Sequence, residues 1–172
     1  IYQGAELIKL NKSYRSTYEI MHFANQIQPI SNLETIERHG AKPEITFCKD
    51  RQSEIDEIKR HLKSFAASNY NTMGIIMKSN QDAVKMFNIL QQDFDISLIT
   101  PTSQRFVDGI SITSVQMAKG LEFDEVIVPE VDSKSYTTEY DRSLLYVACT
   151  RAMHRLTLLH EGKKSPLIAN IH

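Results

Sequence analysis

The sequence is short of the features that mark several protein classes. None of its 172 residues is tryptophan and only two are cysteine, and Cys48 and Cys149 lie far apart with no CxxC pattern. A disulfide framework and a cysteine-ligated zinc site are therefore not expected, and we expect both thiols to behave as small buried hydrophobes. The six histidines form no HExxH pair, so no metal site is predicted.

Long apolar runs and a strong net charge are also missing. No run approaches the roughly 20 apolar residues that a membrane-spanning helix needs, and the first residues lack the basic and hydrophobic regions of a signal peptide. The formal net charge is −1, which excludes bulk electrostatic binding of nucleic acid and makes any such contact local. We expect a soluble, cytoplasmic protein with no membrane partner.

The remaining composition is that of an ordinary globular domain. Apolar residues make up 41% of the chain and charged residues 24%, both close to globular averages. A chain of this length can bury a sizeable core as one unit. We find no internal repeat or second domain, so residues 1–172 are interpreted as a single domain.

Strand patterns alternate with helix patterns along the chain. Between the strands, apolar residues recur at helical spacing, and this alternation predicts βαβ units. The expected fold is therefore α/β, with a mainly parallel sheet covered by helices on both faces. Strands are predicted at residues 6–10, 44–49, 73–77, 96–99, 110–114, 123–128 and 155–159.

Polar residues predict where the helices begin. The sequence Ser16-Thr-Tyr-Glu19 is typical of a capping box, and Asp50 is expected to cap the next helix. Thr138 precedes the last helix. The polar passage 132–140 is expected to be an exposed loop. In the helix that starts at residues 79–82, the side chains predicted to face inward are Val84, Phe87 and Leu90. In the last helix they are Leu144, Leu145, Val147, Ala148 and Ala152.

The polar passage between the strands at 110–114 and 123–128 is the main candidate site. Residues 115–119 can form about one helical turn, and Gly120 stands where a left-handed residue would end it. We expect the side chains of this passage to lie at one edge of the sheet, at the carboxyl ends of strands, where α/β proteins bind ligands. They are Ser114, Gln116, Lys119 and Glu122. The alternative is a crossover that only solvates a turn.

Three segments, in this order, resemble motifs of the UvrD/Rep group of superfamily 1 helicases. Tyr14-Arg15-Ser16 resembles the NYRS of motif IV. Ser114-Val-Gln-Met-Ala-Lys-Gly-Leu-Glu-Phe123 resembles motif V, T-x-H-x-x-K-G-L-E-F, with serine in place of threonine and glutamine in place of histidine. Tyr146-Val-Ala-Cys-Thr-Arg-Ala152 resembles the YVAxTRA of motif VI. With the tail Ser165-Pro-Leu-Ile168, the resemblance extends over nearly the whole chain.

The resemblance implies a RecA-like domain that acts on ATP. It implies that Arg15 and Arg151 are catalytic and reach the γ-phosphate, and that Glu122 approaches the ribose and phosphates, with Gly120 in the same nucleotide-binding loop. An arginine supplied by a neighbouring domain can accelerate phosphoryl transfer by about 10³ to 10⁵. The alternative is that both arginines only pair with surface acids or cap carbonyls.

A second set of residues suits contact with single-stranded DNA. A hydroxyl, an amide and an ammonium make sequence-independent contacts to phosphates, so Ser114, Gln116 and Lys119 are assigned to the strand. The alternative for Lys119 is structural, since a cation is favoured near a helix C-terminus.

The sequence lacks two parts of a complete ATPase site, the phosphate-binding loop and the acidic Mg²⁺ ligand. There is no G-x-x-x-x-G-K-[ST] run to surround the phosphates, and no strand end offers a convincing acid for Mg²⁺. We therefore expect a fragment of a longer chain, in which an N-terminal RecA-like domain holds most of the ATP and Mg²⁺. The short spacing between the first two motifs resembles compact relatives such as helicase IV and the HelD group, which lack a large insertion.

The leading prediction is the C-terminal motor domain of an ATP-dependent DNA helicase or translocase, inactive when isolated. One alternative is the motor domain of a HelD-like ATPase that remodels RNA polymerase. The other is a non-catalytic Rossmann-like binding module.

Overall fold

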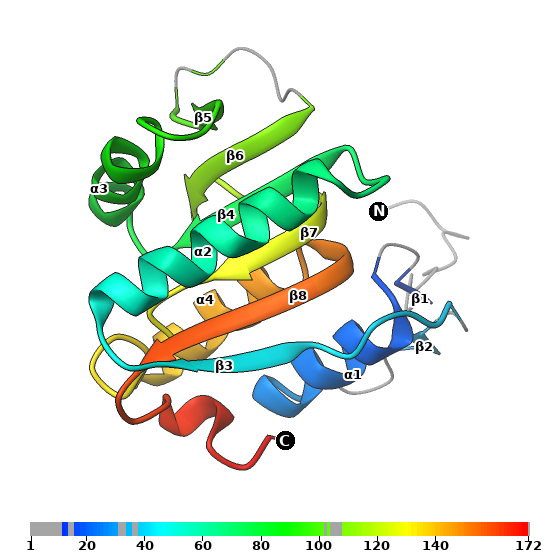
Figure 1. Cartoon of the computed structure of the whole chain (residues 1–172). Coiled ribbons are helices and arrows are strands. Elements are labelled where there is room, and N and C mark those ends of the chain that lie inside the picture. The colour runs from blue at the N-terminus through cyan, green and yellow to red at the C-terminus, as the bar shows by residue number, and fades with distance from the viewer. Residues whose placement is uncertain are drawn as a thin grey trace, which may run out of the picture.

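A six-stranded parallel sheet forms the centre of the molecule (Figure 1). The computed structural model describes residues 12–13, 16–30, 34–35, 38–101, 103 and 108–171. The strand order is β3-β8-β7-β4-β6-β5, and all five neighbouring pairs run parallel. The strands are β3 (Glu44–Cys48), β4 (Thr72–Met77), β5 (Ile96–Leu98), β6 (Gly109–Ser114), β7 (Phe123–Val128) and β8 (Ala152–Glu161). The predicted fold class is confirmed.

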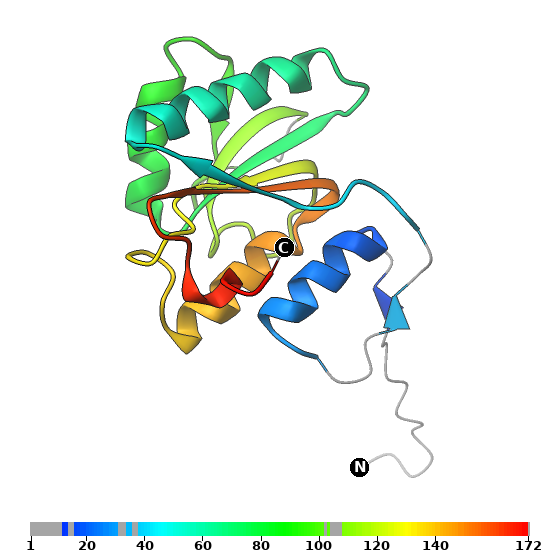
Figure 2. The same cartoon turned by 60° about the horizontal axis from the view of Figure 1, so that its bottom comes forward.

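Helices cover both faces of this sheet, as Figure 2 shows. One core packs α1 and α4 against the sheet, and the other packs α2 and α3 against the opposite face. Every residue of the central strand β4 is buried, as expected for a strand between two helical layers. The helices are α1 (Tyr18–Ile27), α2 (Arg51–Ala66), α3 (Asn80–Leu90), α4 (Glu139–Cys149) and the 3-10 helix η1 (Pro166–Ile168). Two short strands, β1 (Lys12–Ser13) and β2 (Glu34–Thr35), pair separately.

One of the two predicted caps is confirmed and the other is wrong. Asp50 accepts a hydrogen bond from the Ser53 amide, and Thr138 forms a capping box with Asp141. Ser16 does not cap α1, because its hydroxyl donates instead to the Ala152 carbonyl at 2.5 Å. The predicted partner Glu19 accepts from Gly40, so a tertiary contact replaces the local one.

Two predictions of burial and one of secondary structure are corrected. Val84 is 44% exposed, and the inward face of α3 carries Ala83, Met86 and Leu90. Ala152 is not helical, because β8 begins there and pairs with β7. The passage 132–140 is not simply an exposed loop, since Tyr136 is 0% exposed in the core.

Both cysteines are free and buried, as predicted. The predicted strand at residues 6–10 lies outside the described residues. Across the described part of the chain, no helix is both long and apolar enough to cross a bilayer.

Candidate nucleotide and strand site

Residues 115–122 run from the carboxyl edge of the sheet back to its amino edge. Ser114 ends β6 beside Met77, the last residue of β4, whereas Glu122 immediately precedes β7. Because all strands are parallel, these two residues lie at opposite edges, about 20 Å apart for a strand of this length. The prediction that Ser114 and Glu122 share one edge is therefore wrong.

Ser114 lies at the carboxyl edge but is almost completely buried, with 1% of its surface exposed. Its hydroxyl donates to Asn80 Oδ1 at 2.5 Å and accepts from the Met117 amide at 3.4 Å. The only hydroxyl proton is therefore already engaged. The exposed residue at this point is Asn80, the first residue of α3.

Sequence reasoning missed Asn80. Its position at the start of α3, shortly after β4 ends at Met77, could have indicated it, since β4 and β6 are adjacent and end at the same edge.

Gln116, Lys119 and Gly120 follow on the exposed surface of the crossover. The Ala118 amide donates to the Ser114 carbonyl at 2.9 Å, which forms the predicted helical turn. Gly120 has φ +86°, so it is left-handed as predicted. The turn presents the amide and the ammonium to solvent between the two edges.

Arg151 lies at the amino edge, just after α4. Its guanidinium donates to the Val147 carbonyl at 3.2 Å, to the Leu121 carbonyl at 3.3 Å and to Thr150 Oγ1 at 3.4 Å. The Phe123 amide donates to the Arg151 carbonyl at 3.0 Å. Arg151 therefore contacts the residues before and after half-buried Glu122, namely Leu121 and Phe123. These contacts place the arginine of the motif VI segment next to the end of the motif V segment.

Arg15 and Tyr14 lie outside the described residues. The next residue, Ser16, is described and is joined through its hydroxyl to Ala152, the neighbour of Arg151. The first and last of the three motifs are therefore in contact at the amino edge, where β8 begins.

The surroundings of Arg151 are partly apolar. Burial raises the pKa of the Tyr146 hydroxyl, and the nearby Arg151 charge only partly opposes this. Tyr146 therefore stays neutral at physiological pH. No group of three or more metal-ligating side chains occurs in the described ranges, so any Mg²⁺ at this edge would need ligands from elsewhere.

Comparisons with known proteins bear on the family and the fold. The family model of the UvrD-like helicase C-terminal domain matches residues 109–159, the stretch from β6 into β8. The C-terminal domain of a possible DNA helicase from Lactobacillus plantarum WCFS1 is similar in structure, with a TM-score of 0.79 and 34% sequence identity. The match covers 93% of this chain and 94% of that one.

A more distant match is an arterivirus nonstructural protein 10 helicase solved with DNA. Its TM-score is 0.47 at 14% identity, over 69% of this chain and 28% of that chain, which is too low to carry an argument. No curated protein sequence matches. On the 34% identity over almost its entire length, the chain belongs to the UvrD-like helicase C-terminal domain family.

Proposed function

We propose that this domain is the second RecA-like half of an ATP-dependent DNA helicase or translocase. Arg15 and Arg151 act on the triphosphate of ATP, which an N-terminal RecA-like domain of the same protein holds together with Mg²⁺. Glu122 approaches the ribose and phosphates, and Gly120 lets the chain turn beside it. Neither arginine needs to titrate, because guanidinium stays charged in proteins.

The observation that carries the proposal is the contact between Arg151 and the Leu121 carbonyl. It joins a cation to the loop that carries Glu122, at an edge where Ser16 also meets Ala152. A cation at this edge favours a bound phosphate, since charge-assisted bonds to phosphate are short and strong.

Single-stranded DNA contacts the exposed turn of the crossover, at residues 116–120. Gln116 and Lys119 are exposed there, and they contact the phosphates. Ser114 supports them from beneath by holding Asn80 at 2.5 Å. We assign Asn80 to this surface in addition, because it is the exposed member of that pair.

The crossover then links the two tasks mechanically. Its first residue is fixed to α3 through Asn80, and its end is fixed to Arg151 through the Leu121 carbonyl. A strand that shifts the turn at residues 115–120 alters the acceptor that holds Arg151. ATP hydrolysis would in this way respond to DNA.

The test uses the longer protein with its upstream domain, because the isolated domain lacks the P-loop. Arg151→Ala should lower DNA-stimulated ATPase by about 10³-fold or more, as loss of an arginine finger does. Arg151→Lys should rescue little, since an ammonium cannot reproduce the fork. The matched control is Lys85→Ala, which removes an exposed cation paired only with Asp82.

Unchanged turnover in Arg151→Ala, with the protein still folded, would remove the proposed catalytic role. Turnover that falls equally in Lys85→Ala would show that the assay reports net charge and not the site.

A further inference from the structure

A row of cations and rings lies on the side of β8 that faces α2. Tyr70 and His154 stack with ring centroids 4.9 Å apart, and the Arg155 guanidinium lies 5.3 Å from the Tyr70 ring. Arg38 reaches His154 at 3.0 Å and the Met153 carbonyl at 3.2 Å. We call Arg38, Tyr70, His154 and Arg155 the amino-edge strip.

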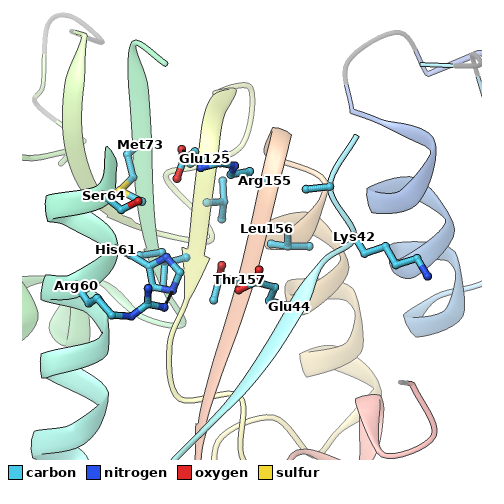
Figure 3. A pocket seen from close by; sticks show the side chains of 13 residues that line it. Lys42, Glu44, Arg60, His61, Ser64, Met73, Glu125, Arg155, Leu156 and Thr157 are labelled. Carbon is cyan, nitrogen blue, oxygen red and sulfur yellow. Dashed lines mark hydrogen bonds and ion pairs between the residues drawn. The ribbon is translucent and has the colours of Figure 1, made fainter. Parts of the chain in front are cut away.

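The strip ends at a polar cavity of about 380 Å³ between α2 and the strands β3, β8 and β7 (Figure 3). The floor carries Glu125 and Thr157, and α2 contributes Arg60 and His61 to the wall. The volume falls in the range of small-ligand sites, about 300 to 1,000 Å³. The Lys42 side chain points away from α2 in the same view.

Two polar side chains at the floor are buried without a full set of partners. Glu125 is 5% exposed and accepts one bond, from Arg155 at 3.3 Å to its Oε1. No described residue donates to its Oε2. Thr157 is 6% exposed, and its hydroxyl makes no hydrogen bond within the described ranges. Neither of these two oxygens is among the described side-chain atoms that are fully buried without a partner, so both keep access to solvent and can bond a ligand.

Arg155 is positioned as a platform. It is held between the Tyr70 ring and the Glu125 carboxylate, yet half of its side chain is exposed. Guanidinium planes are surfaces on which unpaired bases stack. The adjacent carboxylate is the acceptor that matches an exocyclic base amine.

The nearby acids are already engaged. Asp124 Oδ1 lies 3.6 Å from His154 Nε2, within the strip. Asp124 accepts three bonds, from the amides of Asn71 and Thr72 and from the Thr72 hydroxyl. Burial raises the pKa of Glu125, and Arg155 only partly offsets this. A donor from a ligand would complete the stabilisation of the ionised carboxylate.

We propose that the amino-edge strip and this cavity form a second contact for single-stranded nucleic acid, in which a base stacks on Arg155 and donates to Glu125. This rests on the proposed function only in that the domain handles a single strand. The contact lies on the amino half of the sheet, apart from Asn80 and Lys119 at the crossover. The base amine selects cytosine over thymine, because thymine has no exocyclic amine.

The experiment titrates the ¹⁵N-labelled 172-residue chain with oligodeoxycytidylate and with oligodeoxythymidylate. We expect amide shift changes at residues 70 and 154–155, and tighter binding of the cytosine strand. Arg155→Ala should weaken binding about fivefold or more, as loss of a stacking platform does. Glu125→Leu, which removes both acceptor oxygens, should abolish the cytosine preference while keeping overall binding.

Two controls separate the sites. Lys63→Ala removes an exposed cation of α2 that does not line the cavity, and it should change neither affinity nor preference. Asn80→Ala should weaken both strands equally and leave the cytosine preference intact. Thermal melting of each variant establishes that it is folded.

The outcomes distinguish the two proposals. Shifts confined to residues 80 and 116–119 would overturn the second contact and leave the crossover surface standing. Shifts confined to residues 70 and 154–155 would overturn the crossover surface and leave the second contact standing. An absence of shifts at both places would overturn both proposals. Binding of cytidine monophosphate without binding of the strand would also overturn the second contact, because the cavity would then be a free-nucleotide site.

Discussion

Asp141 should stabilise the domain in a strongly pH-dependent way. It is 4% exposed in the first turn of α4. Its carboxylate meets the Lys78 ammonium at 2.6 Å and accepts from the Thr137 and Thr138 amides at 2.9 and 3.0 Å. Burial alone would raise its pKa, but these hydrogen bonds outweigh burial and lower it from 3.8 to about 2.

The size of the effect follows from that shift. A fall from 3.8 to about 2 corresponds to about 2 kcal/mol of folding free energy, at about 1.4 kcal/mol per pKa unit. Because the folded pKa is the lower one, the stabilisation is complete above the unfolded pKa near 3.8. It is lost as the pH falls from there towards 2.

Asp141→Asn keeps the shape of the side chain and removes its charge. Chemical denaturation at pH 7 should show a loss of about 2 kcal/mol in the free energy of unfolding relative to the parent chain. In a pH series the two proteins should converge below about pH 4 and become alike near pH 2. The matched control is Glu139→Gln, in the same turn but 83% exposed and paired with Arg142, which should change stability by less than about 1 kcal/mol.

A loss that is the same at every pH would refute the reasoning, because it would come from packing and not from ionisation. A loss no larger than that of Glu139→Gln would refute it equally.

Three further predictions concern the core, the isolated domain and the crossover. Gly74→Ala should destabilise by about 1 to 3 kcal/mol, since an added Cβ would lie 2.7 to 2.9 Å from the ring of buried Phe123; Phe123→Leu in the same protein should recover part of the loss in urea melts. The purified 172-residue chain should hydrolyse no ATP in a phosphate-release assay, and robust turnover would contradict the split site. Lys119→Ala should reduce the salt dependence of single-strand binding by about 0.7 in log–log slope if it meets one phosphate, and an unchanged slope would exclude that contact.

Local signals explain which parts of the fold could be predicted. The α/β order follows from the alternation of strand and helix periods, which depends on near neighbours in sequence. The Asp50 cap was predicted correctly because it bonds an amide three residues away. The left-handed conformation of Gly120 was predicted correctly for a similar reason, since a left-handed glycine commonly ends a helical turn.

The errors occur where a side chain bonds or packs against a residue that is distant in sequence instead of a neighbour. Ser16 has the sequence of a cap, yet its hydroxyl bonds Ala152, 136 positions away. Ser114 has the chemistry of a phosphate ligand, yet Asn80 engages its proton. Tyr136 lies in a polar passage, yet it is packed into the core. No pattern of neighbours encodes these contacts, since each depends on which strands become adjacent.

The placement of the candidate site failed for a topological reason that also supports its mechanism. A parallel strand pair requires its connection to return from the carboxyl edge to the amino edge, so residues 115–122 cannot stay at one edge. The start of this connection is fixed by the hydrogen bond from Ser114 to Asn80. Its end is fixed by buried Phe123 and by the hydrogen bond from Arg151 to the Leu121 carbonyl. Between these two points, residues 116, 119 and 120 are exposed, whereas Val115 and Ala118 are 0% exposed and anchor the turn in the core. We expect a strand that binds these exposed residues to act on a segment whose far end holds Arg151. The return path that separates the two proposed sites would then also couple them.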